Sequence, residues 1–276
     1  MMTEISVLFD EFGTPTFRAD RETTYFGGVA ISYKSEVETD VFAKCGELFG
    51  LSTSQPRKNR TVGTEKAVSI ASLVCTLPVE IVVNVVNLEN KELKSTWQGY
   101  QSLSNSARAQ YRGARERPLA QFLHAGVLDN CVINCIANFI SKEKPDEYLC
   151  SLFVDNWAIK DDDRRIFVER RCKLFEENIQ RFLRELDLPH RVRVPSMSML
   201  DTDSQRKRFI DTLASVVSRS FLQTSNSRRS KLPLARLRSG LGKSFEYLDS
   251  THIVIDVMKH MTKEINEGKE IPLTLG

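Results

Sequence analysis

The sequence predicts a mixed α/β domain built around a central sheet. Short apolar runs rich in Val, Ile, Leu and Phe suit buried strands, and longer stretches with helical spacing separate them. The run Ile5–Asp10 (ISVLFD) is the first strand, and it ends on two adjacent carboxylates, Asp10 and Glu11, before Gly13. The run Val79–Leu88 (VEIVVNVVNL) is the most β-branched stretch of the chain and predicts another central strand.

The composition is that of a folded protein. The chain has 276 residues, 41% of them hydrophobic, which is enough to bury a substantial core in one large domain or two small ones. No apolar run approaches the roughly 20 residues needed to span a bilayer, and the N-terminus MMTEIS does not resemble a secretory signal. The six cysteines are scattered and form no CxxC pair. We therefore expect a cytoplasmic protein with no membrane partner and with free thiols.

The first half of the chain is expected to alternate strands and helices. Thr24–Tyr33 (TYFGGVAISY) fits a strand that pairs with Ile5–Asp10 as a hairpin across an extended linker. Helical spacing predicts helices over Glu36–Phe49 and Thr64–Leu77, which form a helical insertion at about residues 36–77. The polar stretch 91–117 fits either a loosely packed helix or a segment whose aromatic and arginine side chains grip a nucleic acid strand.

The second half repeats the alternation of helix and strand. Pro118 favours the start of a long helix, and the run YLCSLFVD is a strand that ends on a carboxylate, Asp155. Pro195 is expected at the end of a short fifth strand, and a Ser, Arg and Gly-rich loop follows the helix after it. The expected elements are helix Leu119–Ile140, strand Tyr148–Asp155, helix Arg164–Leu186, strand His190–Ser196, helix Gln205–Leu222 and helix His252–Ile265.

Acidic residues stand at several strand ends and helix flanks. Asp10 and Asp155 each end a predicted strand, and Asp211 lies on the flank of the apolar stripe of a helix. Asp129 projects from an apolar helix face, where a carboxylate is costly unless it is paired, protonated or bound to a metal. Capping or hydrogen bonding to a neighbouring helix is the alternative role for Asp129. Asp201 lies in the loop before the helix that carries Asp211.

The order of elements resembles the ribonuclease H-like fold, a mixed five-stranded sheet flanked by helices. In that fold the first and fourth strands place acidic residues side by side. The motifs DEFG at Asp10–Gly13, FGGVAI, FVD ending at Asp155 and IDTLASVV around Asp211 resemble a bacterial family, the domain of unknown function numbered thirty-eight hundred. This sequence departs from the family pattern at Phe12, usually Ser, at Ile210, usually Ala, and at Arg208, often Gln.

The resemblance also implies a division of the chain. Residues 1–222 would form the ribonuclease H-like domain, with the helical insertion at about 36–77. Residues 223–276 would form a basic loop and a C-terminal helix that packs on the same domain.

A cluster of Asp10, Asp155 and Asp211 would need a divalent cation. Three converging carboxylates repel one another, and their hard oxygen atoms prefer Mg²⁺ or Mn²⁺. Two such ions about 4 Å apart can activate water and stabilise the leaving oxygen of a phosphodiester. The expected function is therefore that of a two-metal-ion nuclease acting on RNA or DNA. Glu11, Asp129 and Asp201 are further candidates for the metal shell. Glu11 is a weaker candidate than Asp10, because neighbouring residues of a strand point to opposite faces and only one of the pair is expected to face the site.

The distribution of charge favours a polyanionic partner. Residues 206–243 carry a net charge of +9, and the rest of the chain carries −6. The basic residues expected to hold a nucleic acid backbone are Arg206, Lys207, Arg208, Arg228, Arg229 and Lys231. A solvated basic arm explains the same charges equally well, and a homo-oligomer or a protein partner stays open.

Two other functional interpretations remain beside the nuclease. One is a catalytically inactive ribonuclease H-like protein that binds or regulates a partner. The other, a toxin-like effector in phage defence, follows only from the family analogy. The sequence contains no GxxxxGK[ST], GxGxxG, HExxH or GxSxG motif, and its four histidines show no metal-ligand spacing. A phosphate-loop enzyme, a zinc enzyme and a serine hydrolase are accordingly not expected.

Overall fold

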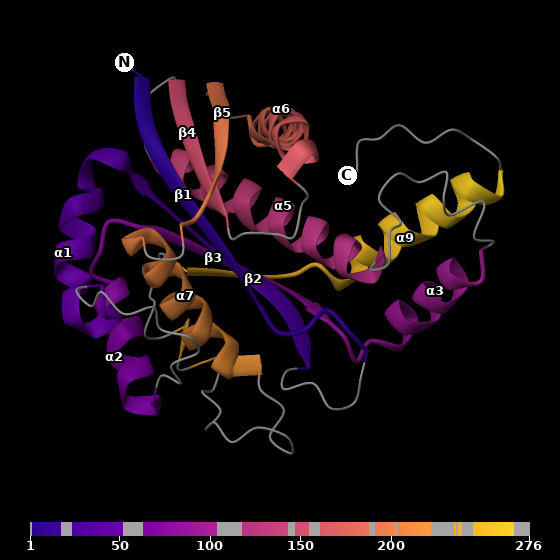
Figure 1. Cartoon of the computed structure of the whole chain (residues 1–276), viewed down its shortest axis with the longest axis horizontal. Helices are drawn as coiled ribbons and strands as arrows, with labels where there is room; N and C mark the ends of the chain where they lie inside the picture. The colour runs from indigo at the N-terminus through magenta and orange to yellow at the C-terminus, as the bar shows by residue number, and fades with distance from the viewer. Residues whose placement is uncertain are drawn as a thin grey trace.

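A mixed sheet forms the centre of the molecule (Figure 1). The computed structural model describes residues 2–17, 24–51, 63–103, 118–142, 147–154, 161–187, 191–201, 204–221, 235, 237–238 and 245–267. The strands are β1 (Met2–Phe12), β2 (Tyr25–Lys34), β3 (Glu80–Asn87), β4 (Glu147–Val154), β5 (Arg191–Met199) and β6 (Phe245–Asp249). Their order across the sheet is β5-β4-β1-β2-β3-β6.

The directions of the strands identify the fold. Strands β1, β2 and β3 form an antiparallel meander, β4 lies parallel to β1 on its other side, and β5 lies parallel to β4. This is the strand arrangement of the ribonuclease H-like fold, which confirms the fold class expected from the sequence. The sheet has one strand more than the five expected, because β6 adds parallel to β3 at the edge.

Helices cover both faces of the sheet (Figure 1). One face packs against α1 (Glu38–Phe49), α2 (Thr64–Val74) and α7 (Gln205–Ser218), and we call it the α7 face. The other face packs against α5 (Pro118–Ser141) and α6 (Asp161–Glu185), and we call it the α5 face. Short 3-10 turns, η1 (Ser35–Val37) and η2 (Arg219–Phe221), precede α1 and follow α7.

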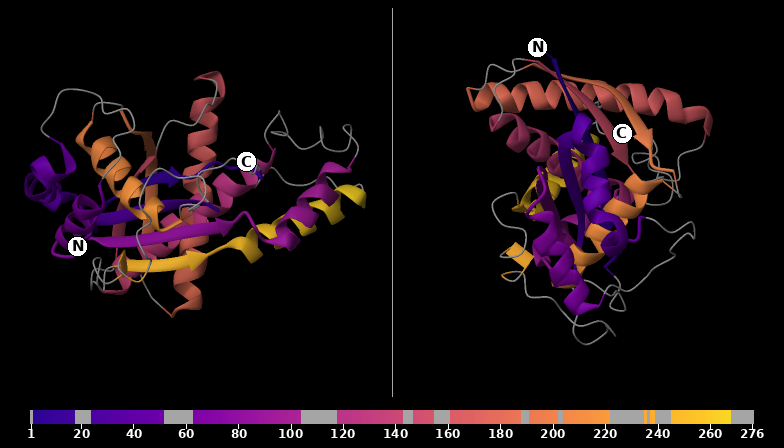
Figure 2. Two further views of the ribbon diagram at one scale, coloured as in Figure 1. Left: turned by 90° about the horizontal axis from the view of Figure 1, so that it is seen from below. Right: turned by 90° about the vertical axis from the view of Figure 1, so that its left-hand side faces the viewer.

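Two further helices lie together at one end of the sheet. They are α3 (Lys91–Gln101) and α9 (Thr251–Asn266), and they run side by side beyond the strands (Figure 2). Asn90 caps α3 by accepting a hydrogen bond from the backbone N–H of Leu93. Helix α9 also contacts α5 and β3, which connects this end of the molecule to the sheet.

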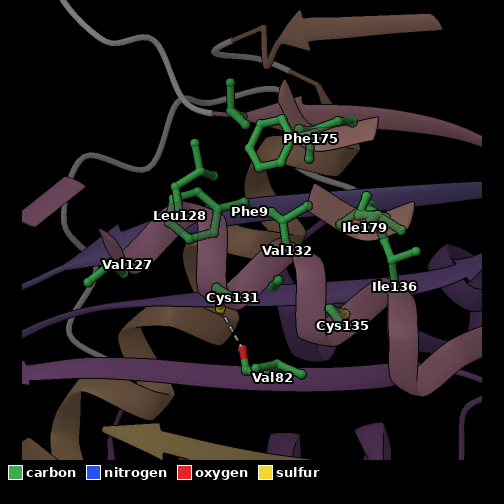
Figure 3. Packing of buried hydrophobic residues seen from close by; sticks show 14 of the residues in the cluster. Phe9, Val82, Val127, Leu128, Cys131, Val132, Cys135, Ile136, Phe175 and Ile179 are labelled. Atoms are coloured by element: carbon green, nitrogen blue, oxygen red, sulfur yellow. Dashed lines mark hydrogen bonds between the residues drawn. The ribbon is translucent and has the colours of Figure 1, made fainter. Parts of the chain in front are cut away.

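Helix α5 lies unusually close to β2 and β3. A Cβ atom added at Gly28 would lie 2.5 Å from the ring of Phe9 and 2.8 Å from Val127, so the absence of a side chain allows the close approach. The thiol of Cys131 donates to the carbonyl oxygen of Val82 at 3.0 Å, as Figure 3 shows. The buried Asn84 side chain donates to the carbonyl oxygen atoms of two residues of α5. These contacts fix α5 against the sheet.

Most expected elements are present, and two expectations are corrected. The sequence did not predict β6, a strand of five residues that precedes α9. It also placed Pro195 at the end of the fifth strand, whereas β5 continues through Pro195 to Met199. Proline is tolerated there because β5 is an edge strand and its pairing with β4 is irregular between Leu149 and Ser151. None of the described helices is both long and apolar enough to cross a membrane.

Candidate metal centre

Asp10 lies near the end of β1 on the α7 face of the sheet. Side chains alternate along a strand, and its neighbours Leu8 and Phe12 both belong to the core on that face. The Asp10 side chain is buried, with 7% of its surface exposed, and its Oδ1 atom accepts a hydrogen bond of 2.9 Å from the backbone N–H of Glu11. Because β4 ends at Val154, opposite Phe9, Asp10 lies one residue beyond the last paired position of β4.

Helix α7 carries Asp211 along the same stretch of β1. Ser204 caps the helix, and an apolar stripe that includes Phe209, Ile210 and Leu213 is buried against the sheet. Asp211 follows Ile210 on the flank of this stripe, and its side chain is 44% exposed.

Contacts at the two ends of α7 show how far along β1 it extends. At its start, the guanidinium of Arg206 lies over the ring of Phe153, whose partner on β1 is Leu8. After its end, Phe221 stacks on Phe12 with a centroid distance of 5.4 Å. Along the direction of β1, Asp211 therefore lies between the positions of Leu8 and Phe12. This is the stretch of β1 that contains Asp10.

Glu11 and Asp129 lie on the other side of the sheet. Glu11 pairs with Gly28, whose missing side chain would point at Phe9 and Val127 of the α5 face. On α5, Asp129 is about 160° around the helix from Val127, so it points away from the sheet. Glu11 and Asp129 therefore lie on the side of the sheet opposite to the side chain of Asp10.

Asp155 and Asp201 follow the strands that are parallel to β1. The carboxyl ends of β1, β4 and β5 lie at the same end of the sheet, because the three strands run in one direction. Asp201 is exposed, and its carbonyl oxygen accepts hydrogen bonds from the backbone N–H and the hydroxyl of Ser204. Asp155 follows Val154 in the sequence and lies outside the described residues.

The described residues bring two of the expected metal ligands to one face of the sheet. They contain no group of three or more His, Cys, Asp or Glu side chains that could hold a metal ion. They do place Asp10 and Asp211 on one face, beside the same strand, and carboxylate oxygen atoms are the ligands that Mg²⁺ and Mn²⁺ prefer. The two carboxylates are thus of the ligand type that a divalent cation would take.

The three cations at the start of α7 have partners within the protein. Arg206 donates to both carboxylate oxygen atoms of Glu38 at 2.8 Å, and Arg208 donates to the carbonyl oxygen of Leu51 at 3.4 Å. Lys207 forms an ion pair with Asp211. The other basic residues expected to hold nucleic acid, Arg228, Arg229 and Lys231, lie outside the described residues.

Glu38 is the centre of a small polar network. The hydroxyl of Tyr33 donates to Glu38 at 2.7 Å, and burial together with the charge of Glu38 raises the pKa of Tyr33. Burial alone would lower the pKa of Arg206, but the hydrogen bonds and the charge of Glu38 outweigh it and raise that pKa. The network holds the start of α7 against the start of α1, and so it helps to position Asp211.

A cavity of about 350 Å³ lies elsewhere, between α6 and β5. Its lining includes Cys172 and Val194, which belong to the core of the α5 face. The sheet separates this cavity from the side chain of Asp10, so we do not assign it to the metal centre.

Lys207 was expected to hold nucleic acid, and its ion pair with Asp211 was not predicted. The two residues are four positions apart on one helix, and this spacing brings oppositely charged side chains together. The Arg206–Glu38 contact had no comparable signal, because 168 residues separate its partners.

Comparison with known proteins gives only distant likenesses. No family model and no curated protein matches the chain. It is similar to a crystal structure of Bst-RNase HIII in complex with Mn²⁺, with 11% identity over 96% of this chain and 70% of that chain and a TM-score of 0.34. A mutant of Bst-RNase HIII gives 12% identity over 97% and 70%, with a TM-score of 0.36. The ribonuclease H-like fold is shown by the order and directions of the strands in the sheet.

Proposed function

We propose that the chain is a divalent-metal-dependent phosphodiester hydrolase, a nuclease that acts on RNA or DNA. The observation that carries the proposal is the placement of Asp10 and Asp211 on one face of a ribonuclease H-like sheet, beside the end of β4. Asp155 would complete the site, since it follows the last residue of β4 in the sequence. Asp201, at the same end of the sheet, is the further candidate.

The chemistry follows from these ligands. Bound Mg²⁺ or Mn²⁺ would activate water and stabilise the charge that develops on the phosphate. The residues of this chain would hold the cation through Asp10, Asp155 and Asp211, and the burial of Asp10 would strengthen its attraction for the cation. Glu11 and Asp129 are left out of the proposed site because they lie on the α5 face.

We also propose that the basic region from Arg206 to Lys243 attracts the nucleic acid backbone. Its net charge of +9 supports this role. Arg228, Arg229 and Lys231 are the preferred contacts, because Arg206 and Arg208 already have partners within the protein. We also propose, from the resemblance of the motifs around Asp10 and Asp211, that the chain is related to the bacterial domain of unknown function numbered thirty-eight hundred.

A second candidate is an inactive ribonuclease H-like protein that binds or regulates a partner. The ion pair between Lys207 and Asp211 favours it, because an ammonium group already neutralises one of the proposed metal ligands.

A nuclease assay on variants distinguishes the two candidates. We expect the natural protein to cleave labelled RNA or DNA with Mn²⁺ and not with EDTA. Asp10→Asn and Asp211→Asn should each lower the rate by at least about 100-fold, since each removes a charged metal ligand. Asp129→Asn is the matched control on the far side of the sheet, and its rate should stay within about twofold of the natural rate. Equal losses in all three variants, or no cleavage by the natural protein, would refute the nuclease.

A further inference from the structure

The first turn of α7 has an unfavourable charge pattern. Arg206, Lys207 and Arg208 follow Gln205 directly, and the turn contains no acidic residue. The positive end of the helix dipole disfavours cations at this position. A sequence that breaks a local rule in this way carries a compensating interaction or a function.

Two of the three cations stabilise the fold. Arg206 makes a two-pronged ion pair with Glu38 at the start of α1 and covers the ring of Phe153, with its guanidinium carbon 3.9 Å from the ring centroid. Arg208 donates to the carbonyl oxygen of Leu51, just beyond the end of α1. Both residues connect α7 to the neighbouring helix, and this accounts for their positions.

Lys207 is directed to Asp211 instead. Its ammonium group forms an ion pair with the Oδ1 atom of Asp211, and its side chain is only 15% exposed. A lysine placed before its acidic partner is the less favourable order on a helix. Asp211 is 44% exposed, so water solvates its carboxylate and screens the pair. Stabilisation of the helix is therefore a weak explanation for this pair.

We propose that Lys207 is the counter-ion of Asp211 in the metal-free protein, and that a divalent cation competes with Lys207 for this carboxylate. The inference rests on the proposed function, in which Asp211 is a metal ligand. Two cations near one carboxylate repel each other, so the ammonium group of Lys207 lowers the affinity of the site for the metal ion. The affinity for Mn²⁺ is thus limited by a residue that is not a metal ligand.

Titration calorimetry with Mn²⁺ on the full chain tests the competition. Lys207→Met removes the positive charge and keeps an unbranched aliphatic side chain of similar length. This variant should lower the Kd for Mn²⁺ by about three- to tenfold. Lys207→Arg keeps the charge and should leave the Kd within about twofold of the natural value. Lys259→Met, which removes an exposed lysine paired with Glu92 on another part of the surface, should leave it unchanged.

The outcomes separate this inference from the proposed function. If the natural protein binds Mn²⁺ and Lys207→Met binds it equally or more weakly, the competition is refuted and the metal site stands. If Lys207→Met binds Mn²⁺ and the natural protein does not, the competition is supported and the natural chain is not a metal-dependent nuclease. If neither binds, both proposals are refuted. Circular dichroism checks that each variant is folded, and Lys207→Gln serves as a second neutral variant.

Discussion

Gly28 is a residue whose lack of a side chain determines how closely β2 and α5 approach each other. The sequence FGGVAI predicts a close-packed strand, and the structure gives the cause, since the rings and methyl groups of Phe9 and Val127 occupy the space of a side chain. Gly99 on α3 is the contrasting case, because no atom other than those of the adjoining helix backbone and its chain neighbours lies within 4 Å of a Cβ atom added there.

Alanine at these two glycines should change stability in opposite directions. Gly28→Ala forces overpacking and should lower the free energy of unfolding by about 1 to 3 kcal/mol. Gly99→Ala improves helix propensity and should raise it by about 0.5 to 1 kcal/mol. Urea denaturation followed by circular dichroism measures both. A loss of stability at Gly99 as large as that at Gly28 would contradict this account of the packing.

Single acidic residues were the least predictable part of the site. The alternation of a strand correctly separates Asp10 from Glu11, because it depends only on backbone geometry. The position of Asp129 depends on which side of α5 meets the sheet, and the apolar stripe alone did not show this. Cys131 and Cys135 face the sheet, where small side chains permit close approach, so Asp129 faces away from it.

At the scale of elements, α7 is positioned by its first turn. Arg206 and Glu38 join two helices that are far apart in the sequence, and both side chains are partly buried. Sequence patterns predicted both helices from their apolar spacing. They did not predict which charged residues join them, because such contacts depend on the tertiary structure.

Removal of the Glu38 carboxylate should loosen the attachment of α7. Glu38→Gln leaves the Arg206 guanidinium without its charged partner and should lower the free energy of unfolding by about 1 to 3 kcal/mol. Glu92→Gln, which breaks the exposed pair with Lys259, is the control and should leave the urea midpoint unchanged. Equal midpoints for the two variants would show that the Arg206–Glu38 pair does not stabilise α7.

Strand β6 shows where local patterns were insufficient. Its sequence FEYLD does not alternate regularly between apolar and polar residues, it is only five residues long, and it follows a basic stretch. It becomes a strand because β3 offers an unpaired edge, and the sequence alone does not show that edge. The longer strands β1 and β3 were predicted because burial on both faces gives continuous apolar runs.

At the scale of the whole molecule, the buried thiols connect stability to pH. Burial raises the pKa of Cys135 from its ordinary value of 9.0 to about 12 and that of Cys172 to about 11. A folded-state pKa above the unfolded value means that the stabilisation is complete below pH 9 and is lost as the pH rises, because only the unfolded chain then releases the proton.

We therefore expect the free energy of unfolding to fall between pH 9 and pH 12. One fully buried thiol such as Cys135 contributes up to about 1.4 kcal/mol per pH unit to this slope. Cys135→Ser should make the slope shallower, and Cys75→Ser, at an exposed thiol, should not change it. The measurement is a series of urea denaturation curves at increasing pH. Slopes that do not differ between the two variants would refute the contribution of Cys135.

The overall arrangement was predictable because strands and helices differ in the spacing of their apolar residues along the sequence. Alternating strands and helices gave the sheet, its two faces and the end that carries the candidate residues. The placement of Asp211 beside the stretch of β1 that contains Asp10 was not predictable, since it requires α7 to cross β1 at a particular level. That level is set by contacts such as Phe12 with Phe221 and Arg206 with Phe153, which the sequence does not show.

A crystal of the protein soaked in Mn²⁺ tests the central claim most directly. The account predicts an anomalous difference peak within about 2 Å of carboxylate oxygen atoms of both Asp10 and Asp211, with Asp155 as a further ligand. The same soak of Asp10→Asn should remove or strongly weaken the peak. A peak bound only to Glu11 or Asp129 on the other face, or no peak beside Asp10 at a saturating concentration of Mn²⁺, would contradict the account.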